Sequence, residues 1–235
     1  MLACFNTFGG HMRINDDFSR RAVVSPRQHD WVASPQAGVE RVMLDRIGAE
    51  KARATSLVRY APNSYFPSHL HPGGEEILVL EGTFVGDEHH YPAGWYLRSP
   101  PGSSHQPSSP DGALIFVKLR QMSPLEQHSV RIDIRDPTRW AERDGGTSCP
   151  LFAGFEEMVS IERRRAETRA FESRVGGIEL LILEGSLHEG DHTYECGTWI
   201  RLPPGDCPVM SSGRDGVTFY LKTGHLTDVS VDGVA

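Results

Sequence analysis

The sequence predicts an all-β protein made of two jelly-roll barrels in tandem, and two observations lead to this expectation. The stretch "HLHPGGEEILVLEG" (residues 69–82) has a near-copy, "ESRVGGIELLILEG" (residues 172–185), 103 positions further on. The chain also holds many short apolar runs separated by turn residues, among 24 glycines and 16 prolines. Short strands at this spacing are typical of β-sandwiches and β-barrels.

The repeat extends well beyond these two stretches. Residues 76–109 align with residues 179–212 without a gap and share 14 identities over 34 positions. Average residue usage would give about two. After a slip of one residue, "DGALIFVK" aligns with "DGVTFYLK". A repeat of this size indicates two similar structural units in one chain.

Each copy contains three strand signals in the same order. The runs "EILVLEG" and "ELLILEG" are apolar, end in glycine and are too short for helices. The runs "GWYLRSPPG" and "TWIRLPPG" end at Pro-Pro-Gly, because proline donates no hydrogen bond to a sheet. The runs "ALIFVKL" and "VTFYLKT" are the richest in β-forming residues.

The first of these strands is apolar on both faces. Side chains alternate along a strand, so Ile77 and Val79 share one face with Glu75, whereas Leu78 and Leu80 share the other. Apolar residues on both faces indicate burial on both sides. We expect the second side to be covered by the other repeat or by a second chain.

The domain boundaries follow from the repeat and from the composition between its copies. The segment "RDPTRWAERDGGTSCP" has the proline, glycine and charge content of a linker. We therefore expect an N-terminal extension (1–34), a metal-binding jelly roll (35–125), a linker (126–148), a second jelly roll without metal ligands (149–228) and a tail (229–235).

Composition and charge exclude several classes of partner. The net charge is −7, and the basic run Arg163-Arg164-Arg165 lies between glutamates, which is typical of a solvated face rather than a nucleic-acid patch. No apolar segment approaches the ~18 residues of a membrane span, and the N-terminus lacks a secretory pattern. The four cysteines show no CxxC spacing. We expect a cytoplasmic protein with reduced thiols and no nucleic-acid or membrane partner.

Four ionisable residues of the first copy have the arrangement of a metal site. His69 and His71 point to one side of an extended chain, because side chains alternate. The turn after them allows Glu75 to return on the same side, and His105 follows the Pro-Pro-Gly turn of a later strand. Three imidazoles and one carboxylate suit Fe(II), Zn(II), Mn(II), Ni(II) or Cu(II), and spacing alone does not choose among them.

The second copy lacks all four of these side chains. They align with Glu172, Arg174, Ile178 and Pro208, although the surrounding frame persists. Such a joint loss is expected if the four residues serve one ion in the first copy and none in the second. The sequence therefore predicts one divalent transition metal ion, bound by the first copy alone.

Ionisable residues that occur in both copies are expected to be structural, because the second copy has no metal. Glu75 is favoured over Glu76 as the ligand, because only Glu76 recurs. The recurring residues are Glu76, Glu81, His89, Tyr91 and Arg98, which align with Glu179, Glu184, His192, Tyr194 and Arg201.

Two tyrosines are candidate catalytic residues of the first copy. Tyr65 and Tyr96 align with Thr168 and Trp199, so the second copy has no tyrosine at either position. The alternative, that both only pack, stays open. The remaining histidines have no partners at ligand spacing and are expected at the surface; they are His11, His29, His90, His128, His188 and His225.

At these motifs the sequence resembles the cupin superfamily. "HLHPGGEE" followed by "LEG" resembles its first motif, and "PAGWYLRSPPGSSH" resembles its second. The stretch "HPGGEEILVLEG" is similar to the corresponding sequence of the ChrR-type cupins, which form the C-terminal half of zinc-dependent anti-sigma factors. It is similar also to stand-alone cupins that include acetylacetone-type and dihydroxyacetophenone-type dioxygenases. The resemblance covers about residues 35–225 and implies a bicupin, two double-stranded β-helices, with His69, His71, Glu75 and His105 as ligands.

One departure from the ChrR-type pattern narrows the function. Those anti-sigma factors hold the sigma factor through an N-terminal domain with a His-xxx-Cys-xx-Cys zinc site, and this chain has no such motif. Two functions stay open. The first is an Fe(II)-dependent dioxygenase-like enzyme for a small carbonyl or diketone compound. The second is a non-enzymatic Zn(II)-binding sensory module. Either binds a small molecule, and the resemblance also implies a homodimer.

Overall fold

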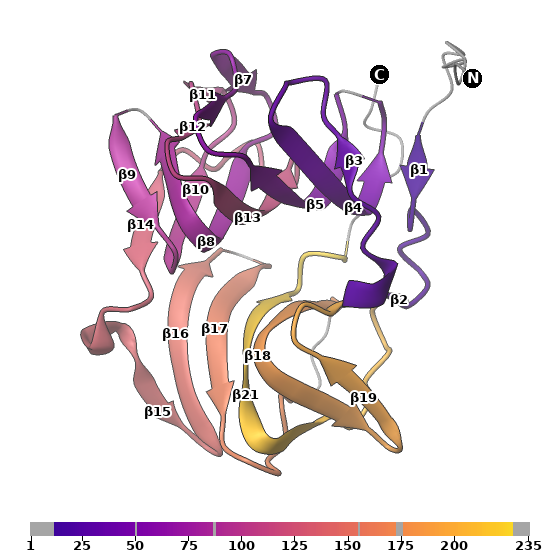
Figure 1. Cartoon of the computed structure of the whole chain (residues 1–235). Coiled ribbons are helices and arrows are strands. Elements are labelled where there is room, and N and C mark those ends of the chain that lie inside the picture. The colour runs from indigo at the N-terminus through magenta and orange to yellow at the C-terminus, as the bar shows by residue number, and fades with distance from the viewer. Residues whose placement is uncertain (1–11, 50, 87, 155, 173–175, 228–235) are drawn as a thin grey trace.

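Strand is the dominant secondary structure in the computed structural model, which describes residues 12–49, 51–86, 88–154, 156–172 and 176–227. Two short 3-10 helices, η1 (Pro26–Gln28) and η2 (Pro137–Arg139), interrupt the strands of these ranges. Figure 1 shows two jelly rolls packed one on the other, which confirms the predicted all-β tandem fold. No helix within the described ranges is long and apolar enough to cross a membrane.

The first jelly roll, the upper one in Figure 1, is built on one large sheet and a small ribbon. The main strands lie in the order β1 (Arg13–Ile14), β4 (Val39–Ile47), β5 (Arg53–Tyr60), β13 (Ala113–Leu119), β8 (Glu75–Gly86), β10 (Trp95–Ser99) and β14 (Val130–Asp133). The short strands β3 (Val32–Ala33), β6 (Ser64–Tyr65), β9 (His89–Pro92) and β12 (Ser108–Ser109) extend this sheet. The separate ribbon pairs β7 (His69–His71) with β11 (Ser103–His105).

The second jelly roll repeats this strand order. Its strands lie in the order β15 (Ala141–Arg143), β16 (Gly146–Ala153), β17 (Met158–Arg164), β21 (Ser211–Thr223), β18 (Ile178–Glu189), β20 (Trp199–Leu202) and β2 (Ala22–Val24), and β19 (His192–Glu195) pairs with β18. Strands β8, β10 and β13 of the first roll thus correspond to β18, β20 and β21 of the second. The repeated sequence motifs lie on these corresponding strands.

Strand β8 is buried on both faces, as its sequence predicts. Ile77 and Val79 face the interior of the first roll, where they pack with Leu97. Leu78 faces the second roll and shares a continuous core with Trp199. The second side of β8 is therefore covered by the other half of the same chain. The homodimer expected from the sequence stays a prediction.

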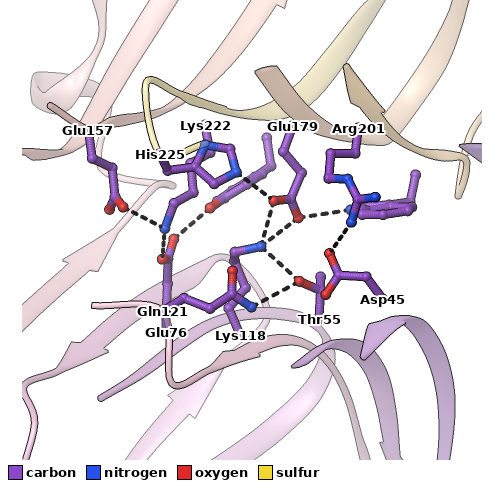
Figure 2. A network of polar contacts seen from close by, with 12 residues as sticks. Asp45, Thr55, Glu76, Lys118, Gln121, Glu157, Glu179, Arg201, Lys222 and His225 are labelled. Carbon is purple, nitrogen blue, oxygen red and sulfur yellow. Dashed lines mark hydrogen bonds and ion pairs between the residues drawn. The ribbon is translucent and has the colours of Figure 1, made fainter. Parts of the chain in front are cut away.

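A buried network of charged groups crosses the interface between the rolls (Figure 2). The Lys222 ammonium of the second roll donates to Glu76 of the first at 2.8 Å. The Lys118 ammonium of the first roll donates to Glu179 of the second at 2.6 Å. These two ion pairs are reciprocal, because Glu76 and Glu179 occupy corresponding strand positions. The recurring glutamate therefore joins the two rolls, in agreement with its predicted structural role.

The network holds its acids ionised and its histidine neutral. Burial alone would raise the pKa of Glu76, but Lys222 and Arg98 outweigh it and hold the pKa at about 2. Burial lowers the pKa of His225 to about 4, against the attraction of Glu179. The His225 side chain is 4% exposed and its Nε2 lies 3.0 Å from Glu179. The surface position predicted for His225 is therefore wrong, because spacing to other ligands says nothing about burial between two domains.

This histidine predicts a loss of stability in mild acid. The unfolded chain takes up a proton at His225 below a pKa of ~6.5, whereas the folded chain takes it up only near 4. Between these two pKa values the unfolded state therefore binds more protons than the folded state. The free energy of unfolding falls for this reason as the pH drops from about 6.5 to 4.

We expect the variant His225→Gln, which keeps a donor for Glu179 but does not titrate, to show a weaker pH dependence. Urea midpoints of parent and variant, measured from pH 7 to pH 4, test this. An identical slope in both proteins would contradict the burial of a neutral His225.

Each roll takes its last strand from the segment that leads into the other roll. Strand β14 pairs with β10 of the first roll, and the chain then continues into the second. Strand β2 pairs with β20 of the second roll, and the chain then continues into the first. Figure 1 shows β14 beside β10 in the upper roll and β15 in the lower one.

The two segments predicted as extension and linker contain strands that belong to the two rolls. Residues 126–148, predicted as a linker, contain β14, η2 and β15, and residues 1–34, predicted as an extension, contain β1, β2, η1 and β3. Proline, glycine and charged residues mark the turns of these segments. The strands between the turns are two to four residues long and carry too little apolar pattern to be recognised.

Candidate metal centre

The four predicted ligands come from three neighbouring strands. Strand β7 begins with His69 and ends with His71, β8 begins with Glu75, and β11 ends with His105. Within the ribbon, His105 lies directly opposite His69. Residues 69 and 71 are two positions apart on one strand, so all three imidazoles lie on one face.

A glycine turn brings Glu75 to the same place. The Gly74 backbone N–H donates to the His71 carbonyl at 3.1 Å, and Gly74 has a φ of +77°. This left-handed conformation favours glycine. A Cβ atom at Gly74 would also lie 2.3 Å from the sulfur of Met122. The turn of the first motif therefore depends on a residue without a side chain.

The ligand atoms of His69, His71, Glu75 and His105 all lie within 4.8 Å of one another. The Glu75 Oε2 atom is 3.3 Å from His105 Nε2 and 3.6 Å from His71 Nε2. His69 Nδ1 lies 2.8 Å from the Pro67 carbonyl oxygen. If Nδ1 carries the proton and donates it to this oxygen, the lone pair of Nε2 is available to a metal. No second group of this kind occurs among the residues that the structure describes.

The surroundings of these atoms fit a divalent transition metal. His71 Nε2 and His105 Nε2 are buried and have no hydrogen-bond partner. Burial lowers the pKa of His71 to about 4 and that of His105 to about 3, so both imidazoles are neutral at pH 7, as metal ligands must be. Burial raises the pKa of Glu75 to about 8, partly offset by Arg131. Buried, neutral nitrogen atoms that converge on a carboxyl group, whose proton a bound metal would displace, are suited to Fe(II), Zn(II), Mn(II) or Ni(II).

A cavity of about 750 Å³ opens onto this cluster. This volume is typical of a small-molecule site. His69, His71 and Glu75 form part of its wall. Most of the remaining wall is apolar and includes Val39, Val58, Phe66, Ile115, Val117 and Leu119.

The second roll has no such ligands at the corresponding positions. Ile178, in place of Glu75, is 1% exposed and belongs to an apolar core. Pro208 stands in place of His105, and Glu172 pairs with Arg169 at 3.5 Å. Arg174, the fourth aligned residue, lies outside the described residues.

The structure brings neither candidate tyrosine to the cavity. Tyr65 is 52% exposed, whereas its neighbour Phe66 packs on the His69 ring with centroids 5.9 Å apart. Tyr96 pairs with Leu78 and lies in the core between the rolls, on the face of the sheet opposite Glu75. The catalytic role predicted for them is not supported, because comparing two copies does not reveal which face a side chain occupies.

Two residues beside the cluster were missed by the sequence prediction. Tyr60 lies in the cavity wall, and burial together with Glu75 raises its pKa well above the ordinary value. Arg131 lines a small inner cavity with Glu75 and His105, and its guanidinium donates to Ser99 Oγ at 3.1 Å.

Arg131 can be compared with a residue of the second roll only once the strand pairing is known. Arg131 pairs with Leu97, and Val23 pairs with the corresponding Ile200 of the second roll. The arginine is thus absent from the second roll together with the four ligands. It lies on a strand taken for a linker, so no alignment of the motifs includes it.

Comparison with known proteins agrees with this geometry. The family model described as the ChrR cupin-like domain matches residues 19–123, which contain all four candidate ligands. Residues 19–123 thus match a cupin family, and the whole chain has the cupin fold. Among curated proteins the comparison finds no match to this chain.

Solved structures show the same fold over nearly the whole chain. A proposed dioxygenase from Nostoc punctiforme has a TM-score of 0.73 and 16% identity, over 91% of this chain and 86% of that one. A proposed glyoxylate-induced protein from Pseudomonas aeruginosa has a TM-score of 0.68 and 16% identity, over 98% of both chains. Protein Ylba from E. coli has a TM-score of 0.67 and 19% identity, over 91% of this chain and 94% of that one. At these identities the likeness shows the fold alone.

Proposed function

We propose that this cupin is a metal-dependent, dioxygenase-like enzyme that acts on a small carbonyl compound of the diketone type. The observation that carries the proposal is the cavity that opens onto His69, His71 and Glu75. A structural zinc site is closed by its four protein ligands and needs no cavity. A catalytic site keeps a position open to a substrate. The Nostoc punctiforme neighbour, a proposed dioxygenase of the same fold, supports this choice.

One group of residues would bind the metal, and another would bind the substrate. A divalent metal bound by His69, His71, Glu75 and His105 would supply Lewis acidity at a substrate oxygen and, if it is iron, reactivity toward O₂. The apolar wall, with Val58 and Phe66, excludes water and favours a compound with an alkyl or aryl body.

A second function is favoured by a different observation. The family model that matches the chain is that of a ChrR cupin-like domain, and ChrR-type cupins resemble this chain at the first motif. A zinc-loaded module of this kind would bind a small molecule in the same cavity without turnover. The two functions therefore differ in the metal bound and in the consumption of oxygen.

We expect anaerobically purified protein to contain iron and, once loaded with Fe(II), to consume O₂ with acetylacetone or dihydroxyacetophenone at a rate on the order of 1 per second or faster. The matched control is the same protein loaded with Zn(II), which is not redox-active and should consume none. Oxygen electrode traces and metal analysis give the answer. Protein that contains zinc alone and consumes no oxygen with any diketone would rule out the enzyme in favour of the sensory module.

A further inference from the structure

Strand pairing aligns the two rolls beyond the region of sequence similarity. Phe116 of β13 pairs with Leu57 of β5, and Tyr220 of β21 pairs with Ile161 of β17. Phe116 and Tyr220 correspond, because each pairs on its other side with the matching leucine of β8 or β18. Leu57 therefore corresponds to Ile161, and the positions around them can be compared one by one.

A repeated contact supports this alignment. Two residues after Leu57 and two residues after Ile161, each strand carries an arginine, and each arginine stacks on a tryptophan. The Arg59 guanidinium lies 4.0 Å from the Trp31 ring centroid, and the Arg163 guanidinium lies 3.8 Å from that of Trp140. The same contact in both rolls shows that β5 and β17 have the same side-chain orientation.

The interior of the second roll contains its own carboxylate. Glu162 is 6% exposed. Its carboxylate accepts hydrogen bonds from Ser148 Oγ at 2.7 Å and Ser160 Oγ at 2.6 Å, and it pairs with Arg164 Nη2 at 2.8 Å. Two hydroxyls and one guanidinium thus hold a buried anion at this position.

At the corresponding positions the described residues of the first roll keep donor groups and place a valine where the second roll has its carboxylate. Glu162 corresponds to Val58, which is shorter and leaves part of the cavity open. Ser160 corresponds to Ser56, which keeps the hydroxyl, and Ser148 corresponds to Arg41, which adds a guanidinium. Tyr60 stands in place of Arg164. All four of these residues line the cavity.

The charge of the cavity points the same way. The protein carries a net charge of −7, yet the described part of the cavity wall contains Arg41, Arg46, Lys51 and Arg120, with Glu75 as its acidic residue. Glu75 belongs to the metal cluster. Four cationic side chains in an otherwise mostly apolar wall favour an anionic ligand.

We propose that the cavity binds a small organic acid, whose carboxylate lies at Arg41 and Ser56 where the second roll places Glu162. The carbonyl end of the same molecule would then point toward the metal cluster, and this part of the proposal rests on the proposed function. An arginine and a hydroxyl are well suited to a carboxylate, because charge-assisted hydrogen bonds are the stronger kind.

Two probes that differ only in charge test the proposal. Succinylacetone is a β-diketone that ends in a carboxylate, and its methyl ester lacks that charge. We expect the zinc-loaded protein to bind succinylacetone at least ~10-fold more tightly than the ester in calorimetric titrations. The variant Arg41→Met should lose this preference. Arg59→Met is the matched control, because Arg59 lies on Trp31 outside the cavity and should keep it.

A second variant transplants the carboxylate of the second roll. Val58→Glu should fill the anion position and abolish binding of succinylacetone, while the protein still binds one zinc ion. Equal affinity for acid and ester in the parent, or an unchanged preference in Arg41→Met with normal zinc content, would overturn the proposal. Binding is measured on the zinc-loaded protein, which does not turn over, so it is independent of the proposed reaction. If that protein prefers the acid but the iron-loaded protein consumes no oxygen, only the dioxygenase proposal is rejected. Oxygen consumption with no preference for the acid would reject only the carboxylate site.

Discussion

Replacing His105 by alanine should abolish tight metal binding. His69 and His71 lie on one strand and Glu75 starts the next, whereas His105 would reach a bound ion from the opposite strand of the ribbon. Loss of an outer partner of a ligand already weakens metal affinity by ~10–100-fold. Loss of a ligand itself should therefore weaken it by more than about 100-fold. Titration of parent and variant with Fe(II) and Zn(II) measures the change.

The control for this variant lies in the second roll. His192 is exposed on β19 and corresponds to His89 of the first roll, so His192→Ala should leave the metal content unchanged. A His105→Ala protein that still binds one ion as tightly as the parent would refute the assignment of the site, and so would a His192→Ala protein that has lost it.

Replacing Lys118 by methionine should destabilise the whole chain by about 3–5 kcal/mol, the usual cost of removing one partner of a buried ion pair. Lys118 and Glu179 are each 1% exposed, and their charged atoms lie 2.6 Å apart. Without the ammonium, the Glu179 carboxylate keeps Trp199 and His225 as its hydrogen-bond partners within the described part of the chain. Urea denaturation, followed by fluorescence, gives the free energy of unfolding.

Two further variants show that the cost comes from the unpaired charge. Adding Glu179→Gln to Lys118→Met should recover part of the loss, because the remaining amide is neutral. Glu40→Gln removes one partner of an exposed pair with Arg59 and should cost less than about 1 kcal/mol. If Lys118→Met cost no more than Glu40→Gln, the buried network would not be what holds the rolls together.

The repeat made the fold and the cluster of three histidines with Glu75 predictable, and residues outside the repeat were missed for physical reasons. Glu75 could be told from Glu76 because only one of them recurs, and the structure indeed places Glu75 at the cluster and Glu76 at the interface. Arg131 could not be found, since it lies on a strand of four residues. The positions of Tyr65 and Tyr96 depend on which face of the sheet each occupies.

The exchanged strands β2 and β14 bear on the ancestry of the molecule. If the chain were cut between its halves, each half would carry the edge strand of the other and expose the core that Leu78 and Trp199 share. Two identical single-roll chains with this connection could complete themselves only by trading strands, as a domain-swapped dimer does. Joining the end of one such chain to the start of the next gives the present arrangement without a new contact. In the fused chain each roll is encoded separately, so one could lose its metal ligands and become a pure scaffold while the other kept the chemistry.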